Sequence, residues 1–389
     1  MNVLRLCFVG PAHNVTFRRW VQWFGRRGHD VTVLTVEPAE PSDVEGFRQI
    51  DLRASGGSRK IGRLIAAWKL VREIRRMNPD LVHVHYLRGL AWGLVASRPH
   101  PCVVTPWGSD VLEEQGAFRE WYSKPLTRAL LRMADLVSVH SEFMKASVER
   151  ILPGLSSLVR IGWGIDLKTF RKGMPTMALR NRWGIPSDAR VIFSPRLARR
   201  LYRHETIVQA LPLILKAVPR AVLVVTEQFA DTDYLAFLKE LVSELGVSPS
   251  VRFVRPIPYS EMPVWMNLAE VVVMVPDSDG MPNTLLETMA CGASLVLKRL
   301  PQYRELIQDG IHGTYVAGAP DEIARAVVDL LNDSGKRATM SVANRAVVAR
   351  LADQNTEMRR MEEYYAKLVS ASRDAPQRAL GVEPKARKS

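Results

Sequence analysis

Short runs of β-branched and other apolar residues alternate along this chain with longer stretches in which apolar residues recur at helical spacing. The apolar runs predict buried strands at residues 3–9, 80–86, 135–140, 191–194 and 271–275. Glycine, proline and polar residues interrupt the pattern after several of these runs, and helical periodicity then begins. Strands that alternate with helices are typical of parallel sheets, so the pattern predicts an α/β fold with Rossmann-like, doubly wound sheets.

The length of 389 residues suits two medium-sized domains, each with its own core. Breaks in the pattern place a first domain at residues 1–172, a glycine- and proline-punctuated linker at 173–187, and a second domain at 188–352. Residues 370–389 contain proline, arginine and lysine without apolar periodicity, which predicts a disordered basic tail.

Residues 270–293 contain a predicted strand, a polar loop over 276–282, and a helix that Asn283 or Thr284 can cap. The start of a helix attracts anions, because its first N–H groups and the positive end of its dipole face the loop.

Two carboxylates flank this start: Asp279 lies before the helix and Glu287 about one turn into it. Phosphate on the amides and hydroxyl groups on the carboxylates would form a nucleotide-sugar site. A strand, a loop and a capped helix are also generic α/β structure, so spacing alone leaves both interpretations open.

The same stretch resembles the signature of retaining GT-B glycosyltransferases of family 4 (group 1), Ser-x-x-Glu-Gly-x-x-x-x-x-Leu-Glu-x-Met-Ala-x-Gly. Asp279 stands at the first glutamate of that pattern and Glu287 at the second. The resemblance implies that Glu287 holds the ribose hydroxyls and that Asp279 faces the donor sugar. It also implies that the following segment lies near the sugar and the diphosphate; its residues are Gly280, Met281, Pro282, Asn283, Thr284 and Leu285.

A basic loop follows the strand at 191–194, and its arginines suit a diphosphate because guanidinium groups pair bidentately with phosphate oxygens. Arg196-Leu197 fits the Gly-Arg-Leu of the family, but Leu201 occupies the position of its lysine. We expect Arg196 to bind the diphosphate, with Arg200 or Arg203 in place of the lysine. A solvated run of charges is the alternative interpretation.

The first half matches the family less closely. Gly10, with His13 nearby, is what remains of a glycine pair in the first loop, and we expect it on the donor side. The stretch CVVTPWGSDVL resembles an acceptor-side loop, Thr-x-His-Gly-x-Asp, in which Trp107 replaces the histidine. The acceptor-side candidates are therefore Ser109, Asp110, His13 and His85. Asp110 is equally compatible with a helix N-cap.

A metal site is not expected. His83 and His85 share one face of a predicted strand, but no carboxylate or cysteine partner accompanies them in the sequence. The three cysteines have no metal or disulfide spacing and lie in apolar contexts, which indicates reduced thiols in a cytoplasmic protein. The N-terminus is too short and strand-like for a signal peptide, and no apolar run approaches the length of a transmembrane helix.

The net charge of +14 is concentrated in the first half: residues 1–172 hold 26 Lys and Arg against 16 Asp and Glu. Residues 58–77 predict a helix with basic residues around an apolar stripe, which we expect to face the core: Ile61, Leu64, Ile65, Trp68, Val71 and Ile74. The basic face is solvated or meets anionic lipid headgroups. Aromatic residues among arginines and lysines suggest the same contact: Trp20, Trp23, Phe24, Trp121 and Tyr122.

The resemblance implies the GT-B architecture, two Rossmann-like domains facing a cleft, with a helix at about 353–369 that returns to the first domain. It implies a metal-independent enzyme without a cofactor, in which Arg196, Asp279 and Glu287 act on a nucleoside diphosphate sugar. The expected acceptor is a lipid-linked or cell-envelope glycan at the cytoplasmic face of a membrane. The alternatives are a non-catalytic nucleotide-sugar binder and a sugar-nucleotide epimerase or phosphorylase. No nucleic-acid-binding motif accompanies the positive charge, so nucleic acid is not expected as a partner.

Overall fold

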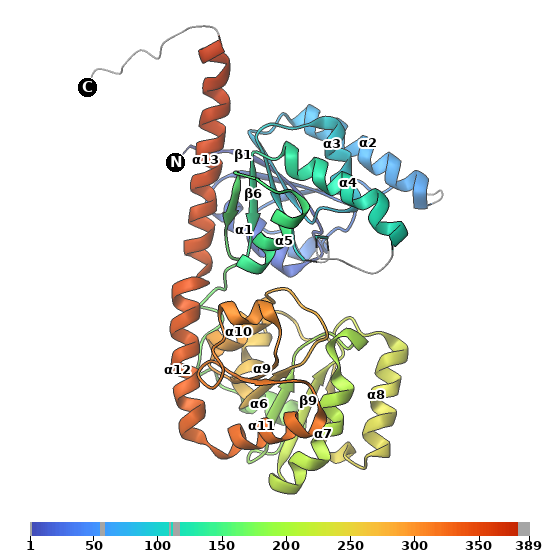
Figure 1. The fold of residues 1–389 in the computed structure, drawn as a ribbon, viewed down its shortest axis with the longest axis vertical. Helices are drawn as coiled ribbons and strands as arrows, with labels where there is room; N and C mark the ends of the chain where they lie inside the picture. Colours follow the sequence, from blue (N-terminus) through green and yellow to red (C-terminus); the bar gives the residue numbers. More distant parts are fainter. Residues whose placement is uncertain (1, 55–58, 109, 112–116, 380–389) are drawn as a thin grey trace, which may run out of the picture. The chain divides into compact units, whose positions relative to one another are not determined.

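The computed structural model describes residues 2–54, 59–108, 110–111 and 117–379. The chain forms two compact units (Figure 1). The first consists of Met1–Trp163 and Thr356–Ser389, and the second of Gly164–Asn355. The first unit is therefore built from both ends of the chain, as a helix returning to the first domain requires.

The first unit contains, within its described residues, a seven-stranded parallel sheet in the order β3-β2-β1-β4-β5-β6-β7. Strand β1 lies between β2 and β4, and Leu6 pairs with Val31 on one side and with Leu81 on the other. The strands are β1 Arg5–Val9, β2 Asp30–Thr35, β3 Arg48–Asp51, β4 Leu81–His85, β5 Cys102–Thr105, β6 Leu136–Val139 and β7 Leu158–Arg160.

Helices cover both faces of this sheet, because successive side chains of a strand point to opposite faces. Cys7 and Val9 of β1 pack with helices α2, α4 and α5, whereas Leu6 and Phe8 pack with α1 and α13. The helices are α1 Val15–Arg26, α2 Arg59–Met77, α3 Leu94–Ser97, α4 Ala117–Met133, α5 Glu142–Ile151 and α13 Gln354–Ala379.

The second unit repeats this plan with a parallel sheet in the order β10-β9-β8-β11-β12-β13. Its strands are β8 Arg190–Ser194, β9 Ala221–Thr226, β10 Val251–Val254, β11 Val271–Met274, β12 Ser294–Lys298 and β13 Thr314–Val316. Its helices are α6 Met177–Arg182, α7 His204–Ala217, α8 Thr232–Glu244, α9 Met262–Leu268, α10 Asn283–Cys291, α11 Pro320–Asn332 and α12 Ser334–Leu351. Two Rossmann-like α/β units confirm the predicted fold class.

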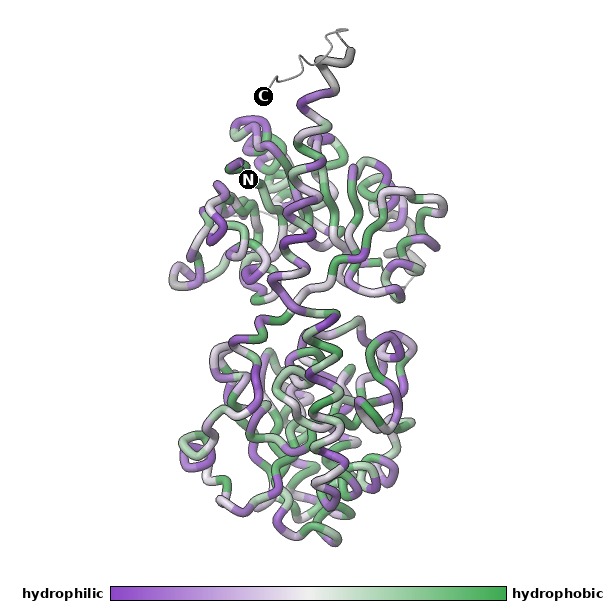
Figure 2. The backbone as a smooth tube through the Cα atoms, turned by 90° about the vertical axis from the view of Figure 1, so that its left-hand side faces the viewer, coloured by the Kyte–Doolittle hydropathy of each residue, from purple (hydrophilic) through white to green (hydrophobic). Residues whose placement is uncertain are grey.

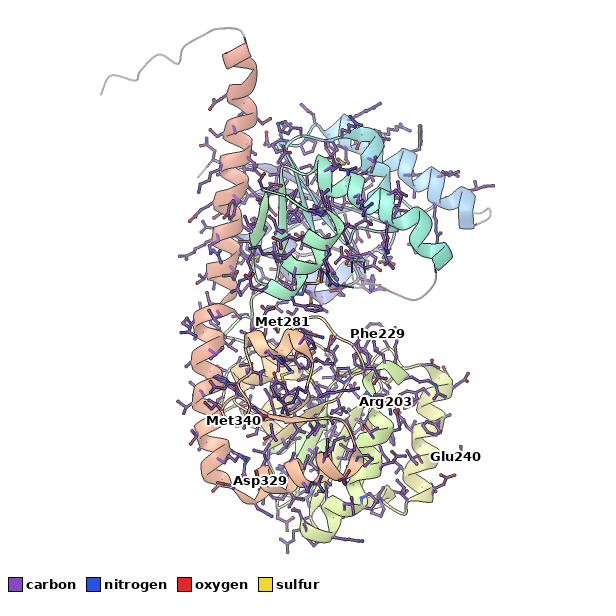
Figure 3. All side chains as sticks on the ribbon, viewed as in Figure 1. Arg203, Phe229, Glu240, Met281, Asp329 and Met340 are labelled. Atoms are coloured by element: carbon purple, nitrogen blue, oxygen red, sulfur yellow. The ribbon has the colours of Figure 1, made fainter. Side chains whose placement is uncertain are left out.

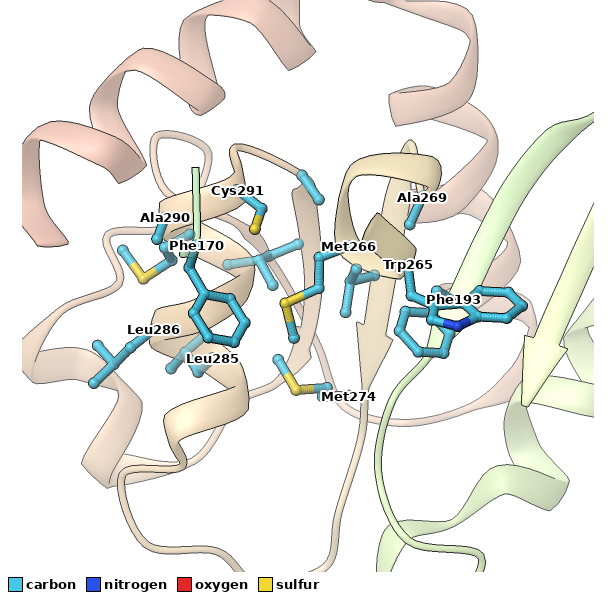
Figure 4. Close-up of a cluster of buried hydrophobic side chains, with 14 of the residues drawn as sticks. Phe170, Phe193, Trp265, Met266, Ala269, Met274, Leu285, Leu286, Ala290 and Cys291 are labelled. Carbon is cyan, nitrogen blue, oxygen red and sulfur yellow. The ribbon is translucent and has the colours of Figure 1, made fainter. Parts of the chain in front are cut away.

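The core on one face of the second sheet fixes α10, the helix that follows the polar loop at residues 276–282. Leu285, Leu286 and Ala290 of α10 pack with Phe170 and Met274 (Figure 4). Apolar segments run through the inside of each unit (Figure 2). No helix in the described residues is both long and apolar enough to cross a membrane.

The division between the units differs from the predicted boundaries. Residues 164–172 belong to the second unit, because Ile165 and Phe170 are buried in its core. The expected linker at 173–187 contains helix α6 and the buried side chains of Leu179 and Ile185. Residues 370–379 are helical, since α13 continues to Ala379; the rest of the expected tail lies outside the described residues.

The structure also corrects two expectations about aromatic and apolar side chains in the first unit. Trp20 and Phe24 lie on the inner face of α1 and are buried in the core, so they are not available to a lipid surface. The side chains of Trp121 and Tyr122 lie outside the described residues. The stripe of α2 faces the core only in part: Ile74 is buried, but Leu64 and Trp68 are exposed.

Candidate functional site

The strand order of the second unit brings the two central candidates together. Strands β8 and β11 are neighbours although β9 and β10 lie between them in sequence, which makes their junction the switch point where α/β sheets bind ligands. Arg196 follows the carboxyl end of β8, and Asp279 follows the carboxyl end of β11. Met281, Phe229 and Arg203, which come from loops after these strands and after β9, lie toward one end of the unit (Figure 3).

Arg196 and Asp279 form a buried ion pair. Nη2 of Arg196 lies 2.9 Å from Oδ2 of Asp279, and both side chains are only 10% exposed. The hydroxyl of Tyr303 donates to Oδ2 at 2.9 Å, and the N–H of Gly280 donates to Oδ1, also at 2.9 Å. Gln302 donates to the main-chain carbonyl of Asp279. These contacts hold both carboxylate oxygens in place.

Both partners of this buried pair have a pKa above the ordinary value, for different reasons. Burial raises the pKa of Asp279 above its ordinary value, although the positive charge of Arg196 opposes that shift. Burial lowers the pKa of Arg196, but the negative charge of Asp279 and nearby tyrosines outweigh it, so this pKa is raised. Arg196 therefore keeps its positive charge where it lies.

One donor group of Arg196 remains available. The guanidinium lies over the ring of Tyr202, with its central carbon 4.5 Å from the ring centre. Its buried Nε has no hydrogen-bond partner among the described residues. A buried donor without a partner is costly, so a ligand that accepts a hydrogen bond there would be favoured.

Helix α10 places Glu287 close to the same loop. The helix begins at Asn283, and Pro282 precedes it without a capping side-chain hydrogen bond, so neither Asn283 nor Thr284 is the cap that the sequence predicts. Glu287 is buried in the second turn, and its Oε1 accepts a hydrogen bond of 2.8 Å from Tyr259. Leu285 points into the core, so its contribution to any ligand site is its backbone.

The structure does not bring Arg200 or Arg203 to the ion pair. Arg200 lies over the rings of Tyr234 and Phe237, with centroid distances of 5.5 and 5.7 Å. Arg203 pairs with Glu205 at 2.7 Å and with Asp277 at 3.4 Å. No contact supports the expectation that one of them replaces the missing lysine. Arg200 contacts aromatic rings, and Arg203 pairs with carboxylates other than Asp279.

Lys298 is a basic residue that the sequence reasoning missed. It ends strand β12, beside β11, and its Nζ lies 2.7 Å from Oδ1 of Asp277. Lys298 and Arg203 lower the pKa of Asp277 against the opposing effect of its partial burial. The position of Lys298 at the end of an apolar strand is a sequence signal that could have identified it.

Tyr259, Gln302 and Tyr303 were also missed as neighbours of the candidate carboxylates. They come from the loop before α9 and from the segment after β12, far from Asp279 and Glu287 in sequence. Tyrosine and glutamine in such segments carry no spacing signal, so only the packing of the second unit reveals them.

In the first unit, Gly10 and His13 lie after the carboxyl end of β1, and His85 ends the neighbouring strand β4. A Cβ at Gly10 would lie 2.7 Å from the ring of Phe17, so the glycine allows close packing of α1. His13 is exposed, and its Nδ1 lies 3.6 Å from Oε2 of Glu37. These residues share the switch point of the first sheet.

His85 lies in an aromatic cluster rather than in open solvent. Nε1 of Trp107 donates to its Nδ1 at 3.3 Å, and Trp20 and Phe17 contact its ring edge-on. Burial lowers the pKa of His85 to about 3, so the ring is neutral at physiological pH. Its buried Nε2 has no hydrogen-bond partner among the described residues. Trp107, which stands at the histidine of the acceptor-side loop pattern, is therefore a hydrogen-bond donor to His85.

Asp110 organises the loop that contains Trp107. Its Oδ1 accepts hydrogen bonds from the N–H groups of Trp107 and Gly108, at 2.9 and 2.8 Å, and its Oδ2 accepts one from Leu87 at 2.8 Å. Burial nevertheless raises its pKa above the ordinary value. Asp110 is a buried anchor that ties the β5 loop to the β4 loop. Ser109 lies outside the described residues.

Comparison with known proteins identifies both units. The family profile "Glycosyl transferase 4-like domain" matches residues 12–158, and "Glycosyl transferases group 1" matches residues 177–347. A GDP-mannose-dependent alpha-(1-6)-phosphatidylinositol monomannoside mannosyltransferase of Mycolicibacterium smegmatis is 30% identical over 270 residues, covering 66% of this chain and 69% of that protein. A D-inositol 3-phosphate glycosyltransferase of Corynebacterium urealyticum is 27% identical over 312 residues, covering 76% and 73%.

Solved structures show the same fold. A glycosyltransferase from Rickettsia africae superposes with a TM-score of 0.79 at 16% identity, over 95% of this chain and 99% of that one. Anabaena HepE, solved in complex with UDP and glucose, gives 0.77 at 17% identity, over 94% and 100%. The chain has two Rossmann-like units, matches both family profiles and is 30% identical to the mannosyltransferase. It therefore belongs to the group 1 (family 4) GT-B glycosyltransferases, enzymes that transfer a sugar from a nucleotide sugar.

Proposed function

We propose that this enzyme transfers a hexose from a nucleoside diphosphate sugar to a hydroxyl group of a lipid-linked or cell-envelope glycan, with the anomeric configuration retained. The observation that carries the donor site is the buried Arg196–Asp279 pair at the switch point of the second sheet, next to the start of α10. The acceptor class follows the mycobacterial relative, whose name specifies a phosphatidylinositol monomannoside.

In this proposal the donor lies along the loop and the start of α10. The unpartnered Nε of Arg196 and the first amides of α10 hold the diphosphate. Pro282, which precedes the helix, has no N–H and takes no part. Glu287 accepts hydrogen bonds from the ribose hydroxyls, and Tyr259 fixes its carboxylate. Asp279 faces the donor sugar and holds Arg196 in position.

The chemistry requires stabilisation of the leaving group. As the glycosidic bond breaks, negative charge grows on the nucleoside diphosphate, and a fixed guanidinium and a helix N-terminus are suited to offset it. The buried site strengthens this effect, because charges interact more strongly where water is excluded. The leaving phosphate takes the proton of the acceptor hydroxyl, so the reaction needs no general base and no metal from the protein.

The first unit supplies the acceptor side. Asp110 positions the loop of Trp107, and the unpartnered Nε2 of His85 provides a neutral hydrogen-bonding group at the end of β4. Neutral imidazole and indole groups suit the hydroxyls and ring faces of a sugar or cyclitol. Nucleotide sugars and the inner leaflet meet at the cytoplasmic face of the membrane, where we place the reaction.

A donor screen tests the site. We expect one member of a panel of UDP-, GDP- and ADP-sugars to raise the melting temperature of the wild type. Arg196→Ala and Glu287→Ala should abolish this shift, whereas Arg182→Ala, which removes an exposed arginine paired with Glu261, should retain it. An equal shift in Glu287→Ala would contradict the ribose assignment.

Product analysis with the stabilising donor tests the reaction. We expect a glycosylated inositol-lipid acceptor whose new linkage keeps the anomeric configuration of the donor. An epimerised or phosphorolysed nucleotide sugar would instead identify the alternative reactions, and a donor that binds without turnover would identify a non-catalytic binder.

A further inference from the structure

His204 is a fully buried polar side chain that the proposed donor site does not include. It is the first residue of α7 and directly follows the loop that carries Arg196. Its Nδ1 lies 3.0 Å from Oγ of Ser194, the last residue of β8, and its Nε2 lies 2.9 Å from the main-chain oxygen of Leu197. The imidazole therefore connects the end of the strand with the loop, at the residue next to Arg196.

The imidazole of His204 is held in one protonation state. Burial lowers the pKa of His204 to about 4, so the ring is neutral at physiological pH. A neutral ring has one N–H, and the carbonyl oxygen of Leu197 can only accept, so Nε2 carries the hydrogen. Nδ1 then accepts a hydrogen bond from the hydroxyl of Ser194. Each ring nitrogen has one fixed role, and the ring cannot turn without losing both hydrogen bonds.

Main-chain hydrogen bonds fasten the same loop at two further positions. The N–H of Asp231, after β9, donates to the carbonyl of Ala198 at 3.0 Å. The N–H of Asp277, after β11, donates to the carbonyl of Leu201 at 2.9 Å. The hydrogen bond from His204 lies nearer to Arg196 in sequence than these two, and it is made by a side chain, so a substitution can remove it.

We propose that His204 is a positioning residue: by holding the backbone at Leu197, it keeps the guanidinium of Arg196 in the place where the diphosphate binds. This inference rests on the proposed function of Arg196 and extends it to a buried residue that contacts no substrate itself. A cation that is already in place stabilises the developing charge without the cost of moving to it. A small displacement of such a group is expensive, because charge-assisted hydrogen bonds to phosphate need accurate geometry.

Calorimetric titration of the full-length protein with UDP, GDP and ADP tests this role without an acceptor. The nucleoside diphosphate that binds the wild type serves as the probe. Arg196→Ala should weaken its binding about tenfold or more, because a charge-assisted hydrogen bond is lost. His204→Leu, which removes both hydrogen bonds of the imidazole, should weaken it about fivefold. This variant should still fold, since the carbonyl of Leu197 keeps the N–H of Arg199 as a donor at 2.7 Å.

Two comparisons separate positioning from a general loss of packing. His204→Gln should restore binding to within about twofold of the wild type, because its amide N–H can donate to Leu197 in place of the imidazole. In the Arg196→Ala background, His204→Leu should have no further effect, because the group that it positions is absent. An equal loss in both backgrounds, or a loss that His204→Gln does not restore, would show that His204 only packs.

His312→Leu is the matched control. His312 is a partly buried histidine of the same unit, and its Nδ1 accepts a hydrogen bond of 3.1 Å from the N–H of Gln308. This variant should bind the probe as the wild type does, and a loss equal to that of His204→Leu would contradict the proposal. Ser194→Ala is a milder second variant that leaves the imidazole in place, and it should weaken binding about twofold.

The Arg196→Ala variant separates this inference from the proposed function. Weaker binding by Arg196→Ala with unchanged binding by His204→Leu would overturn the positioning role and leave the donor site as proposed. Unchanged binding by Arg196→Ala, or no binding of the three diphosphates by the wild type, would count against the donor site, and the role of His204 would fall with it.

Discussion

At the scale of single residues, the candidate site depends on groups that fix its charges. Asp279 is a buried carboxylate, and such a group is stable only if its oxygens have donors. Arg196, Tyr303 and the N–H of Gly280 provide them. The residues that hold Asp279 therefore matter as much as the residue itself.

Tyr303 offers a test of this dependence. Burial raises the pKa of Tyr303 well above its ordinary value, so its hydroxyl stays protonated and donates to Asp279. Tyr303→Phe should destabilise the protein by about 1–3 kcal/mol, because Oδ2 of the buried carboxylate loses one of its two donors and keeps only Arg196. Transfer should slow about tenfold in kcat/KM as Arg196 and Asp279 shift.

Denaturant unfolding and initial-rate kinetics measure the two effects. Tyr315→Phe is the control: Tyr315 is a partly buried tyrosine of the same unit whose hydroxyl donates to the carbonyl of Ile307 at 3.3 Å. If both variants lose activity equally, the loss reflects general packing rather than the Asp279 contact.

At the scale of elements, the end of α10 determines where Glu287 lies. Gly292 terminates the helix with a φ of 74°, and its N–H bonds to the carbonyls of Thr288 and Met289. A left-handed residue at this position is the usual way to close a helix, and glycine adopts it without strain. A Cβ here would also collide with Oγ of Ser341 in α12.

Gly292→Ala should therefore cost more stability than backbone strain alone, about 2–4 kcal/mol in total. Gly310→Ala is a matched control, since Gly310 has a φ of 79° and a Cβ there would have no neighbour within 4 Å. We expect Gly310→Ala to cost about 1–2 kcal/mol, the strain alone. Thermal unfolding measures both, and equal costs would show that the contact with Ser341 yields.

At the scale of the whole molecule, α13 joins the end of the chain to the first unit. Glu362 of α13 pairs with Arg27 at 3.1 Å and with Nε2 of His29 at 2.9 Å. Glu357 accepts a hydrogen bond of 2.5 Å from the N–H of Gly162, and Tyr365 contacts His83. These contacts explain why residues 356–379 belong to a unit that is otherwise built from the first 163 residues.

The pairing of Glu362 predicts a pH dependence. Burial opposes ionisation, but the hydrogen bonds from Arg27 and His29 outweigh it and lower the pKa of Glu362 from 4.5. A carboxylate with a lowered folded-state pKa contributes stability above its unfolded pKa, and that contribution is lost as pH falls through the folded value.

Glu362→Gln should therefore destabilise the protein by about 1–2 kcal/mol at pH 7, and the difference from the wild type should shrink as the pH falls below 4.5. Melting curves across this range measure it, with the exposed neighbour change Glu363→Gln as the control. A difference that persists in acid would show that the pairing does not act through charge.

The local sequence pattern was sufficient to predict the strands and helices that carry the candidate site. The predicted strands at 80–86, 191–194 and 271–275 correspond to β4, β8 and β11 within one or two residues, and the predicted helix at 58–77 corresponds to α2. Apolar periodicity is a local property, because each element must present one face to a core. The positions of Arg196 and Asp279 at strand ends followed from the same pattern.

Which side chains meet depends on how these strands and helices pack. The sheet order β9-β8-β11 brings Arg196 to Asp279 across 83 positions of sequence, and packing adds Tyr259, Gln302 and Tyr303. Packing also leaves Leu64 and Trp68 exposed and buries Trp20, although all three are apolar residues in helical stretches rich in arginine. Periodicity shows that an apolar face exists; which face the core covers depends on the neighbouring elements, and those are assembled by contacts distant in sequence.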